Sequence, residues 1–205
     1  MRHVLCCLVF CVAGMGFADS PFLWSQEPTP LIPPPVSSPN TPGLRELQEK
    51  ESLRNILTRL QELNREKVKP KPLLLKIAPD LSYAQLDDVI DLAMEIKLDG
   101  LVVSNTSISR EGLETPASLL ERIGAGGVSG KPLRKISTAF IQYITQKTNH
   151  GIPVIGSGGI FSATDASEKI NAGAELVQVW TAFIYEGPGL VRKILSSGLK
   201  HKAFF

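Results

Sequence analysis

The sequence predicts an α/β fold in which about four strands of a parallel sheet alternate with helices. Short apolar segments rich in leucine, isoleucine and valine recur from residue 73 onward, and stretches with helical spacing separate them. Strands that alternate with helices form parallel sheets joined by right-handed crossovers. A glycine cluster lies within residues 154–174, where one of these strands passes into a helix. Together these observations predict a unit built from repeated strand–helix pairs.

The predicted helices and strands follow one another in a regular order. Residues 44–67 carry a stripe of leucine and isoleucine opposite charged faces, which predicts the first helix. Ser82 and Gln85 have the spacing of a capping box, so a helix is expected from there to Ile96. The other predicted elements are the strands 73–77, 100–104, 153–155 and 176–179 and the helices 118–123, 132–147, 164–172 and 188–197.

Lys76 is the one charged residue in the predicted strand 73–77. Side chains alternate between the two faces of a strand, so Leu74 and Lys76 share one face and the other apolar residues share the opposite face. A lysine near the carboxyl end of a barrel strand is seldom there for packing, which favours a functional role. The alternative is a lysine that extends its charge to solvent from a frayed sheet edge.

Residues 154–174, VIGSGGIFSATDASEKINAGA, combine a strand end, a glycine cluster and the capped start of a helix. Backbone N–H groups and the helix dipole attract an anion there, and glycine lets a phosphate approach the main chain. In a (β/α)₈ barrel such a turn follows the seventh strand and binds the phosphate of a cofactor or substrate. The next strand ends in Trp180 and Thr181, which suit the other side of that site. The alternative is an ordinary strand–helix turn whose glycines serve tight packing.

Length and composition limit the classes of protein to consider. The chain has 205 residues, room for one domain, whereas a full (β/α)₈ barrel needs about 250. A net charge of +2 and no basic cluster give no reason to expect nucleic acid as a partner. All three cysteines, Cys6, Cys7 and Cys11, lie near the start, so neither a disulfide framework nor a metal-ligand spacing is present.

Residues 1–18 have a short basic start, an apolar run and a small-residue end, as in a secretory signal peptide. The apolar run is short for a membrane span, which needs about twenty residues. A membrane anchor and a chance product of altered gene structure are the alternatives. Residues 19–35 are rich in proline, which favours an extended linker. We expect residues 1–35 neither to pair with a sheet nor to pack tightly.

Five motifs together resemble the dihydroorotate dehydrogenases, the FMN enzymes of pyrimidine synthesis. The resemblance covers roughly residues 36–200, in the order and spacing of the family. It points to the membrane-associated, quinone-dependent class (class 2), because Ser38 stands where the soluble class carries cysteine. The motifs are VSSPNTPGLRELQ at 36–48, KIAPDL at 76–81, VSNTSISR at 103–110, GGVSGKPLR at 126–134 and the glycine segment at 154–174.

The resemblance implies a partial TIM (β/α)₈ barrel, its C-terminal half, behind an unrelated apolar and proline-rich leader. The four predicted strands would be barrel strands 5–8. The family's fourth strand should lead into the loop at 37–43, but prolines at that place cannot donate ladder hydrogen bonds. The expected organisation is a signal-like or anchor segment at 1–18, a linker at 19–35 and a partial FMN-dependent barrel at 36–205.

The resemblance also implies roles for single residues. Ser38 corresponds to the general base that removes the C5 proton of dihydroorotate while hydride passes to flavin N5. Asn40, Asn105 and Thr106 match residues that hold orotate, and uncharged hydrogen-bonding groups suit a planar pyrimidine. A positive charge near flavin N1 would stabilise the reduced ring. The expected FMN-contacting residues are Lys76, Ser104, Gly130, Gly159, Trp180 and Thr181.

The implied activity is oxidation of dihydroorotate to orotate, with FMN passing electrons to ubiquinone at the mitochondrial inner membrane. The signal-like start does not fit that location. Pro35 stands where the family has an asparagine, and the family's first-half flavin contacts and quinone-tunnel helices have no counterpart in this sequence. One competing hypothesis is a truncated or spliced product without catalysis, at most an interaction or regulatory fragment. Another is a secreted half-barrel that self-associates through the edge of strand 73–77. For the chain alone we expect weak or no FMN retention and no measurable dihydroorotate oxidation.

Overall fold

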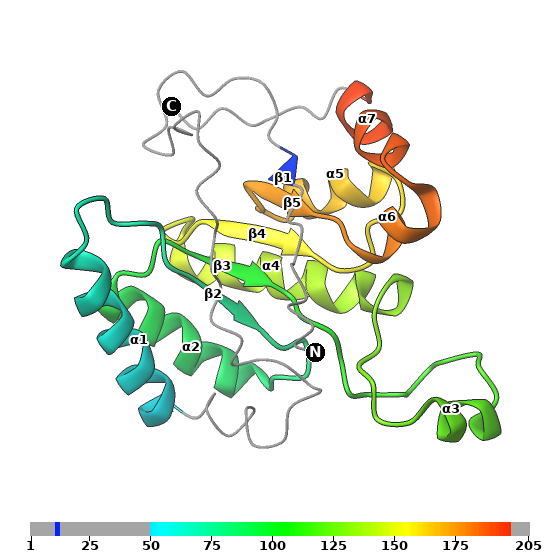
Figure 1. Cartoon of the computed structure of the whole chain (residues 1–205), viewed down its shortest axis with the longest axis horizontal. Coiled ribbons are helices and arrows are strands. Elements are labelled where there is room, and N and C mark those ends of the chain that lie inside the picture. The colour runs from blue at the N-terminus through cyan, green and yellow to red at the C-terminus, as the bar shows by residue number, and fades with distance from the viewer. Residues whose placement is uncertain (1–10, 13–49, 198–205) are drawn as a thin grey trace, which may run out of the picture.

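The computed structural model describes residues 11–12 and 50–197, and within them five strands form one sheet (Figure 1). The strand order is β1-β5-β4-β3-β2. Strands β2 to β5 pair in parallel, as the sequence predicts, and β1 pairs antiparallel with β5. The strands are β1 (Cys11–Val12), β2 (Leu74–Ile77), β3 (Gly100–Val103), β4 (Val154–Ser157) and β5 (Leu176–Gln178).

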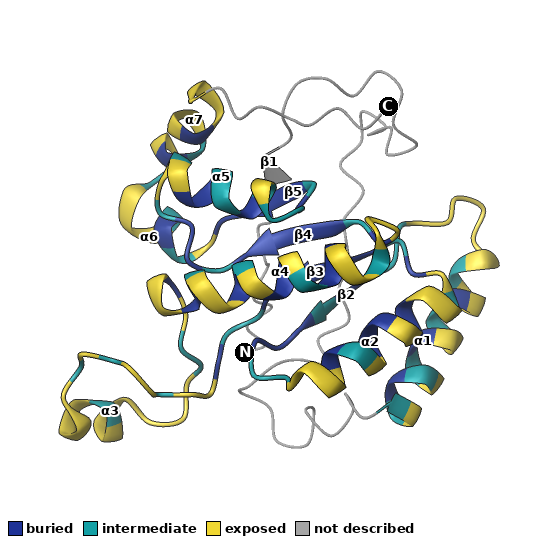
Figure 2. Ribbon diagram, turned by 180° about the vertical axis from the view of Figure 1, so that it is seen from behind, coloured by how far each residue is buried: buried dark blue, intermediate teal, exposed yellow. Residues whose placement is uncertain are grey.

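Helices α2, α4 and α5 cover one face of this sheet, and α1 packs on α2 outside it (Figure 2). Each of the three connects one parallel strand with the next, as in a (β/α)₈ barrel. The fold prediction of a partial barrel is therefore confirmed. The helices are α1 (Lys50–Arg65), α2 (Tyr83–Ile96), α3 (Ala117–Ile123), the 3₁₀ helix η2 (Lys131–Leu133), α4 (Arg134–Thr148), α5 (Ala163–Asn171), α6 (Thr181–Glu186) and α7 (Gly189–Ser196).

Most predicted boundaries agree with the structure within one or two residues. The capping box is confirmed, since the Ser82 hydroxyl accepts from the Gln85 N–H and the Gln85 side chain accepts from the Ser82 N–H. Helix α6 has no counterpart in the prediction. Its sequence, TAFIYE, is dominated by β-branched and aromatic residues with modest helix propensity, so periodicity gave no signal there.

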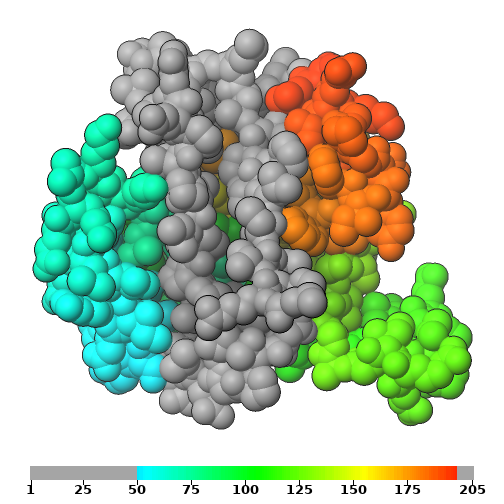
Figure 3. All heavy atoms as spheres, in the orientation of Figure 1, coloured from blue at the N-terminus to red at the C-terminus, as the bar shows by residue number. Residues whose placement is uncertain are grey.

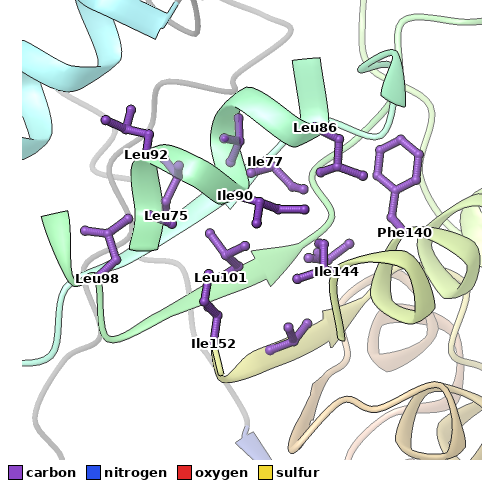
Figure 4. Close-up of a cluster of buried hydrophobic side chains, with 14 of the residues drawn as sticks. Leu75, Ile77, Leu86, Ile90, Leu92, Leu98, Leu101, Phe140, Ile144 and Ile152 are labelled. Carbon is purple, nitrogen blue, oxygen red and sulfur yellow. The ribbon is translucent and has the colours of Figure 1, made fainter. Parts of the chain in front are cut away.

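The larger part of the core lies between the sheet and its helices. Leu75 and Ile77 point into this layer from β2 and meet buried residues of α2 and α4 (Figure 4). Burying one such side chain contributes roughly 1.5–3 kcal/mol. A second cluster joins β5 to α5, α6 and α7. The opposite face of the sheet carries a smaller apolar layer with one residue from each parallel strand: Leu74, Val102, Ile155 and Leu176.

One expectation about residues 1–35 is wrong. Cys11 and Val12 form a short strand whose register partners in β5 are Gln178 and Val177. The open edge of β5 offers unpaired backbone N–H and C=O groups, and a β-branched residue favours the extended conformation that can pair with them. The rest of residues 1–35, and the loop at 37–43, lie outside the described residues.

Residues 107–128 leave the body of the molecule as a long excursion that carries α3 (Figures 1 and 3). Ser107 and Val128 pair at its base through two backbone hydrogen bonds of 3.0 and 2.7 Å. Arg110 donates to the carbonyls of Gly124 and Gly126, both at 2.7 Å, and so holds the two arms together. Among the described helices, none has the length and apolar character needed to cross a membrane.

Candidate functional site

The carboxyl ends of β2, β3, β4 and β5 lie along one edge of the sheet, because these strands are parallel. This edge is where (β/α)₈ barrels place their active-site loops. Lys76, Asn105, Gly159 and Thr181 are each at or just beyond the carboxyl end of a different strand. The prediction that these four residues share one rim is therefore confirmed.

Lys76 lies on the face of the sheet opposite the helices. Its register partner on β3 is Val102, which belongs to the inner apolar layer with Leu74. The Lys76 ammonium donates to Oε1 of Gln178 at 3.4 Å. Two strands separate β2 from β5, which in a flat sheet would place them about 14 Å apart. Two long side chains that lean towards each other span this distance, and a sheet that curves like a barrel wall shortens it. The contact argues against a lysine frayed to solvent.

Gln178 is a buried polar residue that the sequence analysis did not single out. It lies two residues after Leu176 on β5, so both point to the inner face. Ser157, the last residue of β4, is its register partner and is buried as well. Polar residues that end apolar strands on one face were the available signal. Ser157 and Gln178 make the inner face of the sheet polar at the carboxyl ends of the strands, whereas the middle of that face is apolar.

The segment after β3 is fixed between its two neighbouring strands. The Ser104 N–H donates to the Ser157 carbonyl at 2.9 Å, and the Asn105 N–H donates to the Ile77 carbonyl at 2.8 Å. Ser104 is buried, and the peptide bond that precedes it is cis. The Asn105 side-chain oxygen accepts from the Thr106 N–H at 2.9 Å. The predicted substrate residues Asn105 and Thr106 thus lie together on a well-held rim segment.

Asp80 ties the loop after β2 to this same segment. Its carboxylate accepts from the Ser107 hydroxyl and, at 3.3 Å, from the Ile108 N–H. Ser107 is buried and also pairs with Val128 at the base of the excursion. This contact could not be predicted from the sequence, because the two residues are 27 positions apart and neither motif alone shows a partner.

The glycine turn after β4 is shaped by packing against α4. Gly158 and Gly159 both have positive φ, +105° and +73°. A Cβ on Gly159 would lie 2.5 Å from Cα of Arg134. Because that atom belongs to the backbone of α4, the overlap could be removed only by shifting the main chain. Packing alone therefore accounts for glycine at this position, as the alternative in the sequence analysis held. The place of this turn on the rim, and not its glycines, is what favours an anion site there.

The predicted residues Gly130 and Thr181 meet beside this turn. A Cβ on Gly130, where φ is +83°, would lie 3.2 Å from Cγ2 of Thr181 and 3.5 Å from the Phe161 ring. The Thr181 hydroxyl donates to the Ser129 hydroxyl at 3.1 Å. Lys131 places its ammonium 5.4 Å from the centre of the Phe161 ring. Three loops distant in sequence thus meet at one end of the rim.

A cluster of charged residues supports the glycine turn from behind. Arg134 at the start of α4 pairs with Asp165, 2.7 Å, and with Glu168 on α5. Asp165 in turn accepts from the Phe161 N–H at 2.9 Å and from the Ser162 hydroxyl at 2.9 Å. Hydrogen bonding to Arg134 lowers the pKa of Glu168 below its usual value. The glycine turn and the N-terminal end of α5 are therefore held in place by the protein's own side chains.

The structure places most of the predicted site residues. Lys76, Ser104, Asn105, Thr106, Gly130, Gly159, Trp180 and Thr181 all lie along the carboxyl edge of the sheet. Trp180 is 42% exposed and precedes α6. Ser38 and Asn40 lie outside the described residues. Within the described ranges, no group of three or more His, Cys, Asp and Glu residues is arranged to hold a metal ion.

Comparison with known proteins identifies the class to which this fold and rim belong. The family profile of dihydroorotate dehydrogenase matches residues 31–202. The chain belongs to this family. Its curated relatives include proteins named dihydroorotate dehydrogenase (quinone), which are oxidoreductases. One, from Christiangramia forsetii, is 53% identical over 168 residues, 80% of this chain and 48% of the relative. Another, from Gloeobacter violaceus, is 54% identical over 162 residues, 79% of this chain and 44% of the relative.

Solved structures support the same assignment. Ligand-free dihydroorotate dehydrogenase (DHODH) from Eimeria tenella superposes with a TM-score of 0.73 at 36% identity. The match covers 81% of this chain and 52% of the Eimeria chain. DHODH from the same organism in complex with ferulenol gives a TM-score of 0.70 at 38% identity, and the match covers 78% of this chain and 46% of the Eimeria chain. The chain thus spans about half the length of the relatives that it matches.

Proposed function

We propose that the protein acts in the oxidation of dihydroorotate to orotate, with FMN as its cofactor and a quinone as the electron acceptor. Membership of the family supports this proposal, and one observation carries it to this chain's own residues. Lys76 directs its ammonium along the inner face of the sheet to Gln178, at the edge where a barrel enzyme binds its cofactor.

The residues on the rim fit a flavin mononucleotide. A bound FMN would supply the acceptor for a hydride from the substrate. Lys76 supplies a positive charge that suits an electron-rich ring, and the half-buried setting limits the screening of that charge by water. Gly130 lies against Thr181 at the other end of the rim, close to the glycine turn that contains Gly159. The residues proposed to hold FMN are Lys76, Ser104, Gly130, Gly159, Trp180 and Thr181.

Asn105 and Thr106 are proposed to bind the substrate, together with Asn40. Asn105 and Thr106 supply an amide and a hydroxyl, which can donate and accept hydrogen bonds at the imide edges of a pyrimidine ring. The hydrogen bond from Asn105 to Ile77 orders their backbone before any ligand arrives. Such preordering reduces the entropy that binding must remove.

Ser38 is proposed as the general base that accepts the C5 proton of dihydroorotate. A serine hydroxyl is a weak base in water, so this role requires a closed site and a path that carries the proton onward. Because no turnover is expected from the chain alone, the test supplies the missing half of the barrel in trans. Dihydroorotate-dependent reduction of a water-soluble quinone is then followed as orotate absorbance, with Ser38→Ala beside the unchanged chain. Turnover that disappears in Ser38→Ala supports the role. Equal turnover in both would contradict it.

The quinone partner and the mitochondrial inner membrane location are parts of the same proposal. The name of the relatives, which specifies a quinone, supports the quinone partner. The location rests on the family resemblance alone. Fractionation of cells that express a tagged chain tests the location. Recovery of the tag in the inner-membrane fraction is the expected result, and its secretion to the medium would instead support the signal-like interpretation of residues 1–18.

Self-association is proposed as well. Among the described residues β2 and β1 are the two edge strands of the sheet, and open strand edges pair with other chains. Two copies that pair through β2 would extend the arc of strands towards a closed barrel, which has no edges. Sedimentation velocity at micromolar concentration is the test. A dimer is expected, and a stable monomer would show that another element covers this edge.

A further inference from the structure

Lys169 on α5 is the largest fully buried side chain in the described part of the chain, with no exposed surface. Its aliphatic stem lies behind β4, where a Cβ on Gly156 would come 3.1 Å from its own Cβ. Charged side chains are rarely buried completely unless each hydrogen-bonding group finds a partner. The rim residues do not explain its burial.

The Lys169 ammonium makes three hydrogen bonds, all to the first turns of α4. It donates to the Arg134 carbonyl at 2.7 Å, to the Ser137 hydroxyl at 2.5 Å and to the Thr138 hydroxyl at 2.7 Å. These three acceptors use all three N–H bonds of an ammonium group. Lys169 therefore fixes the start of α4 against α5 at one point.

That point is also where α4 supports the glycine turn. Arg134, whose carbonyl Lys169 binds, is the residue whose backbone lies against Gly159. The Arg134 side chain pairs with Asp165, which accepts from the Phe161 N–H within the same turn. A displacement of Arg134 would therefore be transmitted to the turn through a backbone contact and through an ion pair.

We propose that Lys169 is a positioning residue for phosphate binding: through Arg134 it sets the shape of the glycine turn at residues 158–162. This inference rests on the proposed FMN site, because the phosphate concerned is that of the flavin. Lys169 lies behind the turn and acts through α4, without touching the ligand. Its ammonium also adds positive charge behind the place where the anion binds.

The protonation of Lys169 gives the proposal a specific pH dependence. Burial lowers the pKa of Lys169 to about 8. The charged groups that face it are Arg134 from α4, and Asp165 and Glu168 from its own helix, while β4 contributes Gly156 and no charge. An anion bound at the turn favours the protonated form, so by linkage FMN affinity falls as the pH rises from 7 to 9.

The test compares the 205-residue chain with Lys169→Met, which keeps a long side chain but removes the charge. The control is Lys135→Met, because Lys135 is an exposed lysine beside Arg134. FMN and riboflavin are titrated by flavin fluorescence quenching at pH 7 and pH 9. Riboflavin lacks the phosphate, so it separates an effect on the phosphate site from a general loss of structure.

The expected result is that Lys169→Met weakens FMN binding about tenfold at pH 7, the scale of losing hydrogen bonds to a charged group, and leaves riboflavin unchanged. The pH dependence of FMN affinity between 7 and 9 should disappear in the same variant. Equal losses for FMN and riboflavin, or no loss for either, would overturn the inference. Lys135→Met should match the unchanged chain throughout.

Hydrogen exchange keeps the inference testable if the chain binds no flavin, a result that would count against the proposed function alone. Amides of residues 158–162 should exchange faster in Lys169→Met than in Lys135→Met, and equal rates would overturn the inference. Thr138→Val, which removes one acceptor of the ammonium while keeping the shape of the side chain, replaces Lys169→Met if that variant does not fold. It should raise exchange at the same amides.

Discussion

Lys76 on β2 donates a hydrogen bond to Gln178 on β5 at 3.4 Å, across the two strands that lie between them. The pair joins residues 102 positions apart on the concave side of the sheet. Because one partner is charged, the bond orients the lysine along the inner face instead of towards solvent. The proposed flavin site depends on this orientation.

Gln178→Leu should weaken FMN binding by several-fold, because it removes the acceptor that orients Lys76 while keeping a similar side-chain volume. Flavin fluorescence quenching measures the affinity, and thermal unfolding checks that the fold is kept. Gln146→Leu, at an exposed position on α4, is the matched control and should bind FMN as the unchanged chain does. Equal affinities in both variants would show that Gln178 has no part in the site.

Asp80→Asn should loosen the segment that carries Asn105 and Thr106. The change removes the charged acceptor of the Ser107 hydroxyl and the Ile108 N–H, and a hydrogen bond to a charged group contributes about 1.5–3 kcal/mol. Hydrogen exchange of residues 104–110, followed by mass spectrometry, should be faster by about tenfold or more.

Ser107 variants and a control refine this test. Ser107→Ala should reproduce the faster exchange of Asp80→Asn, whereas Ser107→Thr keeps the hydroxyl and should restore slow exchange. Asp91→Asn, at an exposed position on α2, should have no effect on residues 104–110. Unchanged exchange in Asp80→Asn would mean that the backbone hydrogen bonds alone hold the segment.

Gly159→Ala should be far more destabilising than Gly112→Ala. Both glycines have nearly the same φ, +73° and +71°, so the backbone strain of about 1–2 kcal/mol is common to both. A Cβ at Gly159 would also overlap Arg134, whereas one at Gly112 would meet no atom within 4 Å. Such overpacking adds roughly 1–3 kcal/mol. Urea denaturation of the two variants measures the difference, and equal losses of stability would contradict the packing at the turn.

Stability should rise with pH between about 8 and 10.5 because of Lys169. Its pKa is lowered from 10.5 to about 8 in the folded chain. In that interval the folded state has lost the proton and the unfolded state still binds it, and stability increases with pH wherever the unfolded state binds more protons. The gain approaches roughly 3 kcal/mol.

Chemical denaturation at pH 7.5 and pH 10 tests this dependence on Lys169. The gain should be present in the unchanged chain and in Lys135→Met and should be missing in Lys169→Met, so that the difference isolates Lys169 from other groups that titrate. A gain of equal size in all three would assign the pH dependence to those other groups.

Much of the rim could be predicted from the sequence because it depends on local patterns. Strand alternation places Lys76 on the inner face with Leu74, and the capping box at Ser82 fixes where α2 begins. Once the strands are known to be parallel, residues that follow them must share an edge. Glycine also marked the turn at Gly159, although packing against Arg134 is enough to explain it.

The contacts that connect separate motifs could not be predicted in this way. Gln178 ends a strand of three residues, too short for a periodic pattern, and its partner is on β2. Asp80 and Lys169 likewise acquire their roles from residues on other elements. Strand β1 was missed because its pairing depends on the open edge of β5, not on its own sequence.

The most direct test of the proposed flavin site is the FMN affinity of the 205-residue chain and of its Lys76→Met variant, measured by fluorescence quenching at pH 7 with Lys135→Met as the control. We predict weak but saturable binding by the unchanged chain. The affinity should fall about tenfold or more in Lys76→Met, since an oriented charge is lost, and stay unchanged in Lys135→Met. No saturable binding by the unchanged chain, or equal affinity in Lys76→Met, would contradict a flavin site at the carboxyl edge of β2–β5.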